Sequence, residues 1–269
     1  MTSALPAIAI PAALRTMLRA AHPDWHAALE AGLQAMMQAD PAYLPALLAG
    51  PYLPTEGRLF AAFSMPIERV RHVLIGEGPY PRAASATGVC FMDGAVGDLW
   101  AETGLSKAVN RATSLRNFMK MLLVAGGRLM ADRTAGDALS GIAAEARGVG
   151  ATMVQTLPQL QENLLSNGFL LLNAALAFRP AVPPVQEARA WRPFLEVVLT
   201  ALQLHAAASA QTPPLLILWG KVAALIDALP VAAAFPKAVA EHPYNLSFIN
   251  NLSMQKLFGG MALLERRNG

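Results

Sequence analysis

The chain has 269 residues, of which 54% are hydrophobic and 14% are charged, and 21 Lys and Arg against 18 Asp and Glu give a formal net charge of +3. This composition excludes a disordered or acidic-tail protein, and the length suits one large domain with a well-buried core better than two domains. We therefore expect a single domain over residues 1–269, with a net charge too small to indicate a nucleic-acid partner by itself.

The apolar runs and the cysteine count argue against a membrane anchor, a disulfide or a bound metal. The longest apolar run, 168–178, contains Asn173 and is shorter than the roughly 18 residues that cross a bilayer. The apolar N-terminus is interrupted by Pro6 and Pro11 and follows no positive charge, so we expect no signal peptide. Cys90, the one cysteine, cannot alone hold a zinc ion or an iron–sulfur cluster. We expect a cytoplasmic monomer that binds no membrane, metal or cofactor.

The first part of the chain, residues 1–65, is predicted to be helical. Apolar residues in 23–40 recur three or four positions apart, as on one face of a helix. Several prolines then interrupt the pattern, and a second short helix is expected over 56–63. The first strand is predicted over 70–76, and it leads into a turn that contains Gly and Pro.

The middle of the chain is predicted to hold a helix over 114–124, with Ser114 as its N-cap, because a serine hydroxyl can accept from a free N–H of the first turn. Residues 126–150 are rich in Ala and Gly and carry mixed charges, so we expect a surface insertion there.

The second half alternates helices and strands. In order, the predicted elements are a helix over 155–165, a buried strand over 169–172, a helix over 188–207, a strand over 215–219, a helix through Leu229 and a short strand near Ala238. Strands separated by helices predict parallel crossovers. The expected fold is therefore α/β, a three-layer α/β/α sandwich around a short, mainly parallel four-stranded sheet.

Polar residues follow three of the predicted strands. Glu77, Asn173 and His242 each lie at or just beyond a strand end. Ligands of parallel sheets bind at the carboxyl ends of the strands, so these side chains are predicted to share one site.

Six short runs carry a resemblance to a known family. They are Gly-Glu-Gly-Pro-Tyr-Pro at 76–81, Ala-Thr-Gly-Val-Cys-Phe at 86–91, Ser-Leu-Arg-Asn at 114–117, Gly-Phe-Leu-Leu-Leu-Asn at 168–173, Leu-Trp-Gly at 218–220 and His-Pro-Tyr-Asn-Leu-Ser at 242–247. In this order they resemble the uracil-DNA glycosylase superfamily, and most closely its family 1 members. The resemblance implies hydrolysis of the N-glycosidic bond of a flipped-out uracil in DNA, which leaves an abasic site for base excision repair. The implied partner is uracil-containing DNA, single- or double-stranded.

The resemblance also implies which residues bind the base. Asn173 would pair with N3–H and O4 of uracil, a pattern that cytosine does not present. Phe91 would stack on the extruded base, and Tyr80 would fill the space beside C5 and exclude thymine. Glu77 and Gly78 complete the expected base-binding set. Taken singly, each residue type is more often structural, since Asn caps turns and Phe lies in cores.

The remaining implied roles are catalysis and DNA binding. His242 would donate a hydrogen bond to uracil O2 as negative charge develops on the departing base. Leu246 would enter the duplex where the base has left. The expected contacts to the DNA backbone are Pro79, Ser114, Arg116 and Ser247.

Gly78 departs from the family pattern, because it stands where the family has an aspartate that positions the attacking water and offsets charge on the sugar. Loss of such a group costs about 10² to 10⁴ in rate. Three interpretations stay open. In the first, uracil is excised by Asn173 and His242, with Glu77 as a catalytic assistant. In the second, the room at Gly78 and Pro81 admits a modified base of foreign DNA. In the third, the chain binds uracil or abasic DNA without cutting it.

Overall fold

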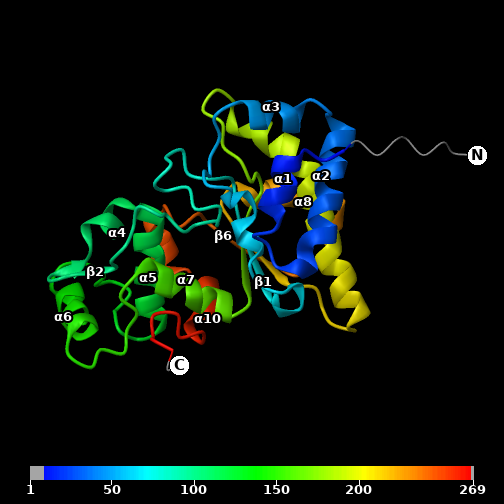
Figure 1. Cartoon of the computed structure of the whole chain (residues 1–269). Coiled ribbons are helices and arrows are strands. Elements are labelled where there is room, and N and C mark those ends of the chain that lie inside the picture. Colours follow the sequence, from blue (N-terminus) through cyan, green and yellow to red (C-terminus); the bar gives the residue numbers. More distant parts are fainter. Residues whose placement is uncertain (1–8, 268–269) are drawn as a thin grey trace, which may run out of the picture.

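The fold is built on one parallel sheet. The computed structural model describes residues 9–267 and is shown in Figure 1. The strands β1 (His72–Gly76), β4 (Phe169–Asn173), β5 (Leu215–Trp219) and β6 (Lys237–Ala240) form a four-stranded sheet in the order β4-β1-β5-β6. Each neighbouring pair is parallel, which confirms the predicted α/β class and the four-stranded sheet. A separate hairpin consists of β2 (Trp100–Ala101) and β3 (Gly104–Leu105).

Helices cover both faces of this sheet (Figure 1). The first layer consists of α1 (Ala12–Leu18), α2 (His26–Ala39), α3 (Tyr43–Ala49), α8 (Pro184–Ala208) and α9 (Val222–Asp227). The second layer consists of α4 (Lys107–Arg111), α5 (Thr113–Ala125), α6 (Asp137–Arg147), α7 (Leu157–Ser166) and α10 (Leu252–Gly259). Short 3₁₀ helices are η1 (Pro23–Trp25), η2 (Arg58–Phe63), η3 (Ile67–Arg69), η4 (Pro230–Ala234) and η5 (Leu246–Asn250).

Two hydrophobic cores lie on the two faces of the sheet. Successive side chains of a strand point to opposite faces, so Val73 and Ile75 join the core under the first layer, and Leu74 joins the core under the second. Every residue of β4 is buried, as expected for a strand that is covered on both faces.

The helix that was predicted over 114–124 starts differently from the expectation. Its first residue is Thr113, and Ala112 is the N-cap, without a side-chain cap. The chain enters α5 directly from α4, and the Ala112 N–H still donates to the Ala108 carbonyl. Ser114 therefore lies inside the first turn, and its prediction as the N-cap is wrong.

The segment 126–150 contains α6, which is amphipathic rather than a loose excursion. Leu139, Ile142 and Ala143 are buried on one face of α6, and the helix packs against the β2–β3 hairpin. That this segment is an insertion, and that the chain is a single domain, both stay predictions.

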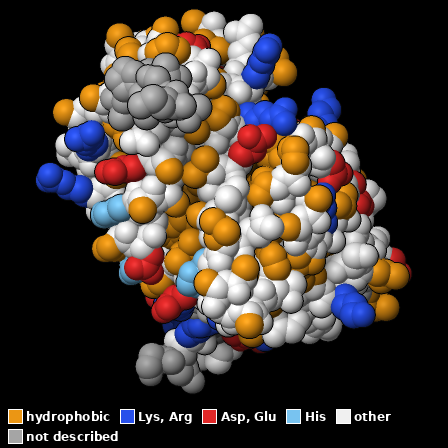
Figure 2. Space-filling view, turned by 90° about the vertical axis from the view of Figure 1, so that its right-hand side faces the viewer, with side chains coloured by type: hydrophobic (Ala, Val, Ile, Leu, Met, Phe, Trp, Pro, Cys, Tyr) orange, Lys and Arg blue, Asp and Glu red, His pale blue; other side chains and the backbone are white. Residues whose placement is uncertain are grey.

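Two further observations concern the surface. No helix within residues 9–267 is long and apolar enough to cross a membrane, and the N-terminal residues 1–8, Pro6 included, lie outside the described part. On the face that Figure 2 shows, Lys and Arg side chains are interspersed with Asp and Glu rather than gathered in one continuous basic area. This distribution agrees with the small net charge of +3.

Candidate active site

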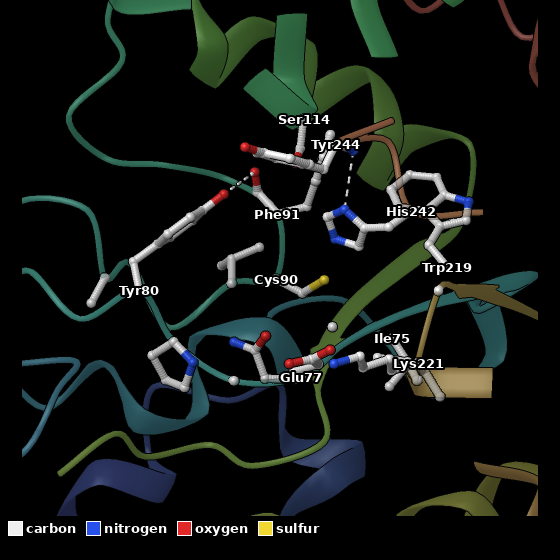
Figure 3. Close-up of a pocket in the computed structure, with 18 of the residues that line it drawn as sticks. Ile75, Glu77, Tyr80, Cys90, Phe91, Ser114, Trp219, Lys221, His242 and Tyr244 are labelled. Carbon is white, nitrogen blue, oxygen red and sulfur yellow. Dashed lines mark hydrogen bonds between the residues drawn. The ribbon is translucent and has the colours of Figure 1, made fainter. Parts of the chain in front are cut away.

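A cavity of about 660 Å³ opens at the carboxyl ends of the strands. It brings together most of the predicted site residues, namely Glu77, Gly78, Pro79, Tyr80, Phe91, Ser114, Asn173 and His242. Figure 3 shows Glu77, Tyr80, Phe91, Ser114 and His242 around this space. The cavity therefore lies where the sequence predicted a site, because ligands of a parallel sheet bind at the carboxyl ends of its strands and residues from distant parts of the chain meet there.

Asn173 is held at the end of β4 beside a glycine that leaves room for it. The strand register pairs Gly76 with Asn173, whose side chain is buried. A Cβ on Gly76 would lie 2.8 Å from Asn173 Oδ1 and 2.8 Å from Cys90 Sγ. Among residues 9–267 the Asn173 amide makes no side-chain hydrogen bond, so its acceptor and its donors are available to a ligand in the cavity.

Phe91 forms an aromatic wall of the cavity. Its ring centroid lies 5.2 Å from that of Phe118 and 5.2 Å from that of Trp219, both edge-on. Its backbone has a φ of +68°, a left-handed conformation that costs a residue other than glycine free energy and that is enriched at functional sites. The Tyr80 hydroxyl donates to the Phe91 carbonyl over 3.4 Å and so closes one side of the cavity (Figure 3).

Two groups of the wall stay uncharged at neutral pH. Burial, with a smaller contribution from the nearby charge of Asp93, raises the pKa of Tyr80 further above its ordinary value. Burial raises the pKa of the Cys90 thiol to about 12, so this cysteine is not a thiolate nucleophile. The wall thus offers shape rather than charge.

His242 has one ring nitrogen fixed by its own loop. The Tyr244 N–H donates to Nδ1 of His242 over 3.1 Å, as the dashed line in Figure 3 shows. Partial burial lowers the pKa of His242, and the negative charge of Glu77 opposes this shift. The ring is therefore neutral at pH 7, and because Nδ1 accepts a hydrogen bond, its proton is on Nε2.

Charged side chains lie at the mouth of the cavity. Glu77, Lys221 and Glu241 all line it, and Glu241 also accepts a hydrogen bond from Asn251 over 2.7 Å. In the described part of the chain neither Glu77 nor Lys221 forms an ion pair. Both groups are exposed and can reach a polar ligand.

The position of Gly78 is open. A Cβ added there would lie 3.7 Å from the Ala175 carbonyl oxygen and 3.9 Å from the Ala175 Cβ, which are ordinary contacts. A second cavity of about 500 Å³ adjoins the first at Glu77 and Gly78, and Pro81 lines this second cavity rather than the first.

Three predicted DNA-binding residues do not line the cavity. Leu246 directly follows the cavity-lining Asn245 and is 67% exposed, and Ser247 after it is exposed too. Arg116 is half-buried and donates to Asn117 Oδ1 and to the Asn110 carbonyl. The role of these three residues in DNA binding stays a prediction.

Some cavity residues had not been singled out from the sequence. They are Trp219, Lys221, Glu241 and Tyr244. Lys221 and Glu241 each follow a strand directly or after one residue, so the rule that found Glu77 could have found them too. No group of three or more His, Cys, Asp or Glu side chains between residues 9 and 267 could hold a metal ion.

The chain is similar to solved and named proteins over most of its length. No family model matches it. A structure of wild-type UNG from Nitratifractor salsuginis has a TM-score of 0.85 and 37% identity, and the match covers 98% of this chain and 100% of that one. A mimivirus uracil-DNA glycosylase has a TM-score of 0.52 at 14% identity over 86% of this chain and 71% of its own, which supports the fold alone.

Among sequence relatives, a uracil-DNA glycosylase of Mycobacterium sp. strain KMS is 26% identical over 229 residues, 83% of this chain and 81% of that protein. One of Corynebacterium efficiens is 25% identical over 227 residues, 84% of this chain and 78% of that protein.

Proposed function

The chain belongs to the uracil-DNA glycosylase superfamily and acts as a uracil-DNA glycosylase, and we propose that the residues lining the cavity recognise a flipped-out uracil and assist the cleavage of its N-glycosidic bond. The main support is that Phe91, Asn173 and His242, far apart in the sequence, line one cavity. Since the family acts on DNA, the substrate is a DNA strand that contains uracil.

Base recognition is assigned to the apolar wall and one amide. In this proposal Phe91 stacks on the uracil ring, and its position is secured by the edge-on rings of Phe118 and Trp219. The free amide of Asn173 accepts from N3–H and donates to O4. Tyr80 lies beside C5, where the methyl group of thymine would collide with its ring.

His242 stabilises the leaving base. When the bond between C1′ and N1 breaks, its electron pair passes to the base, and negative charge gathers on O2. A neutral His242 with its proton on Nε2 donates a hydrogen bond to O2, and this bond strengthens as the charge develops. The sugar becomes electron-poor at the same moment and is attacked by water at C1′; the water loses a proton to the solvent, and the departed uracil anion takes one up, so the reaction balances as a hydrolysis.

Glu77 is the carboxylate that remains near the sugar, since position 78 is a glycine. It lines the cavity, and its charge acts on His242. We assign to Glu77 a partial role, in which it attracts the attacking water and offsets the positive charge of the sugar. The side chain of Glu77 has one more rotatable bond than the family's aspartate and holds its carboxylate less firmly, so this role is weaker.

The DNA backbone is contacted by residues at and near the cavity. Pro79 and Ser114 line the cavity, and Arg116 and Ser247 follow the lining residues Ser114 and Asn245 by two positions in the sequence. Leu246 is exposed on the loop after His242 and enters the duplex as the uracil leaves. Because phosphates are contacted, binding weakens as the salt concentration rises.

A uracil-containing oligonucleotide treated with the protein and then with alkali tests this function. We expect strand breakage at the uracil, and slower excision in the variants Glu77→Gln, His242→Ala and Asn173→Ala. Unchanged excision rates in all three variants would refute the assignment of the active site to this cavity.

The same assay separates the alternatives. A panel of duplexes with modified cytosines, cut while the uracil duplex stays intact, would identify a modified base as the substrate. A uracil duplex that is shifted in a gel but never cut would identify a binding protein.

A further inference from the structure

A buried amide from α5 holds the loop that carries His242. Asn117 is fully buried, and its Nδ2 donates to the backbone carbonyls of Pro243 at 2.7 Å, Tyr244 at 3.3 Å and Asn245 at 3.3 Å. One side-chain amide thus faces three consecutive carbonyls of a loop 126 positions away in the sequence.

This loop, residues 242–247, has few other attachments. It follows β6, and buried Phe248 after it packs on the Trp219 ring. Between these two anchors, the Asn245 N–H bonds back to the His242 carbonyl within the loop itself. In residues 9–267, Asn117 is the side chain that reaches this loop from another element by hydrogen bonds.

The shortest of the three bonds acts on the peptide that fixes His242. The Pro243 carbonyl, which accepts from Asn117 at 2.7 Å, and the Tyr244 N–H, which donates to His242 Nδ1 at 3.1 Å, belong to the same peptide unit. A peptide unit is planar and rigid, and in the trans form its C=O and N–H point in opposite directions. Asn117 on one side therefore sets the direction in which this N–H points on the other side.

We propose that Asn117 is a positioning residue that orients the 243–244 peptide, so that its N–H stays on Nδ1 of His242 and the proton of the ring stays on Nε2, toward the base. This inference rests on the proposed role of His242. It adds a residue that touches neither substrate nor cavity, since Asn117 does not line the cavity.

The electrostatic surroundings of His242 make the role measurable. The charged residues that line the cavity with His242 are Glu77 at the end of β1, Lys221 after β5 and its chain neighbour Glu241, and among them Glu77 raises the pKa of His242. Partial burial in the fixed loop lowers its pKa, so activity that needs the neutral ring persists into mildly acidic solution. A loosened loop solvates the ring, returns its pKa toward the ordinary value of about 6.5 and moves the acidic limb of the kcat/KM profile to higher pH.

Asn163 offers a matched control. It is also a buried asparagine, and its Nδ2 donates to the carbonyls of Leu263 at 2.8 Å and Glu265 at 2.7 Å, neither of which lines the cavity. Both Asn117→Ala and Asn163→Ala leave buried carbonyls without a partner and lower thermal stability. Only the first is expected to alter the chemistry at His242.

The experiment compares kcat/KM for uracil excision between pH 4.5 and 9 in the wild type, Asn117→Ala and Asn163→Ala. We expect Asn117→Ala to lose about 100-fold at neutral pH, the cost of misplacing a hydrogen-bond donor to the transition state, with its acidic limb at higher pH. Asn163→Ala should keep the wild-type profile. Imidazole ¹⁵N shifts of His242 should report protonated Nε2 in the wild type and a tautomer mixture in Asn117→Ala.

A double-mutant cycle completes the test. If Asn117 acts through His242, adding Asn117→Ala to His242→Ala should lower the rate by less than about twofold. The inference is overturned if Asn117→Ala keeps the wild-type pH limb and ¹⁵N shifts, or if its full loss persists in the His242→Ala background. If Asn117→Ala does not fold, Asn117→Ser, a neutral and shorter polar side chain that does not span the same three carbonyls, takes its place. An unchanged rate in His242→Ala alone would instead count against the proposed function.

Discussion

Placing an aspartate at position 78 should raise the rate of uracil excision. The backbone of Gly78 does not adopt a positive φ, and a Cβ there would meet Ala175 at 3.7 Å and 3.9 Å. The substitution Gly78→Asp therefore fits without backbone strain or collision. The new carboxylate would stand where the family has one, beside the cavity and next to Glu77.

The restored carboxylate sets the size of the gain. A positioned general base contributes about 10² to 10⁴ in rate. Two like charges a few ångströms apart in a solvated site repel by about 1 kcal/mol. Glu77 is exposed, so the solvated figure applies. This repulsion lowers the stability of the folded variant but is the same before and during bond cleavage, so the expected acceleration of Gly78→Asp is about 10² to 10⁴-fold.

Single-turnover excision from a uracil oligonucleotide measures this gain, since it isolates bond cleavage from product release. Gly78→Asn, with the same shape and no charge, is the matched control and should gain much less. The double variant Glu77→Gln with Gly78→Asp restores the family's Gly-Gln-Asp-Pro-Tyr run and removes the repulsion. If Gly78→Asp is no faster than Gly78→Asn, while both fold, a missing carboxylate does not limit this enzyme.

Three further predictions concern specificity, base extrusion and stability. Tyr80→Ala removes the ring beside C5 and should reduce discrimination against thymine by about 10- to 200-fold, measured as the ratio of kcat/KM values on matched uracil and thymine oligonucleotides. Leu246→Ala, which shortens an exposed wedge, should slow excision from duplex DNA by about 10-fold while single-stranded substrate is cut at the wild-type rate; equal losses on both would contradict the wedge. His72 stacks on Phe169, its Nδ1 is buried without a partner, and burial lowers its pKa in the folded protein. Below about pH 6.5 the unfolded chain therefore binds more protons at this histidine than the folded chain does. The free energy of unfolding consequently falls as the pH drops through the lowered pKa. His72→Phe should therefore flatten the fall in thermal stability between pH 7 and pH 5, and an equally steep fall in the variant would count against this cause.

The sheet was predictable because its strands are short apolar runs that end at turn residues. The strand over 215–219 matches β5 residue for residue, and β4 extends one residue beyond the predicted 169–172. The first strand begins at His72 rather than at residue 70, since the preceding Ile67–Arg69 forms a 3₁₀ turn. Apolar patterning locates burial, but it does not fix where the ladder of hydrogen bonds starts.

The contacts that depend on distant segments could not be predicted in the same way. Asn117 is a buried polar residue in a helix whose partners lie 126 or more positions later, and no local pattern marks such a pair. Ser114 carried a local signal for an N-cap, but the helix before it overrode that signal. Glu77, Asn173 and His242 are expected at one site from the topology, which brings the strand ends together, whereas Phe91 and Ser114 follow no strand of the sheet and are expected only from the resemblance.

The two glycines of the run at 76–81 show how differently one residue type can be constrained. Gly76 is paired with Asn173 in the sheet register, and any Cβ there would collide at 2.8 Å with both Asn173 and Cys90. A side chain at this position would therefore displace the Asn173 amide or the Cys90 thiol from the cavity wall. Gly78 lies beyond the sheet, has ordinary space around it and adopts no conformation that excludes side chains. Nothing in the packing requires a glycine at position 78, so a rate change in Gly78→Asp reports on the chemistry of the cavity. A rate change in Gly76→Ala would instead report a change in the shape of the cavity.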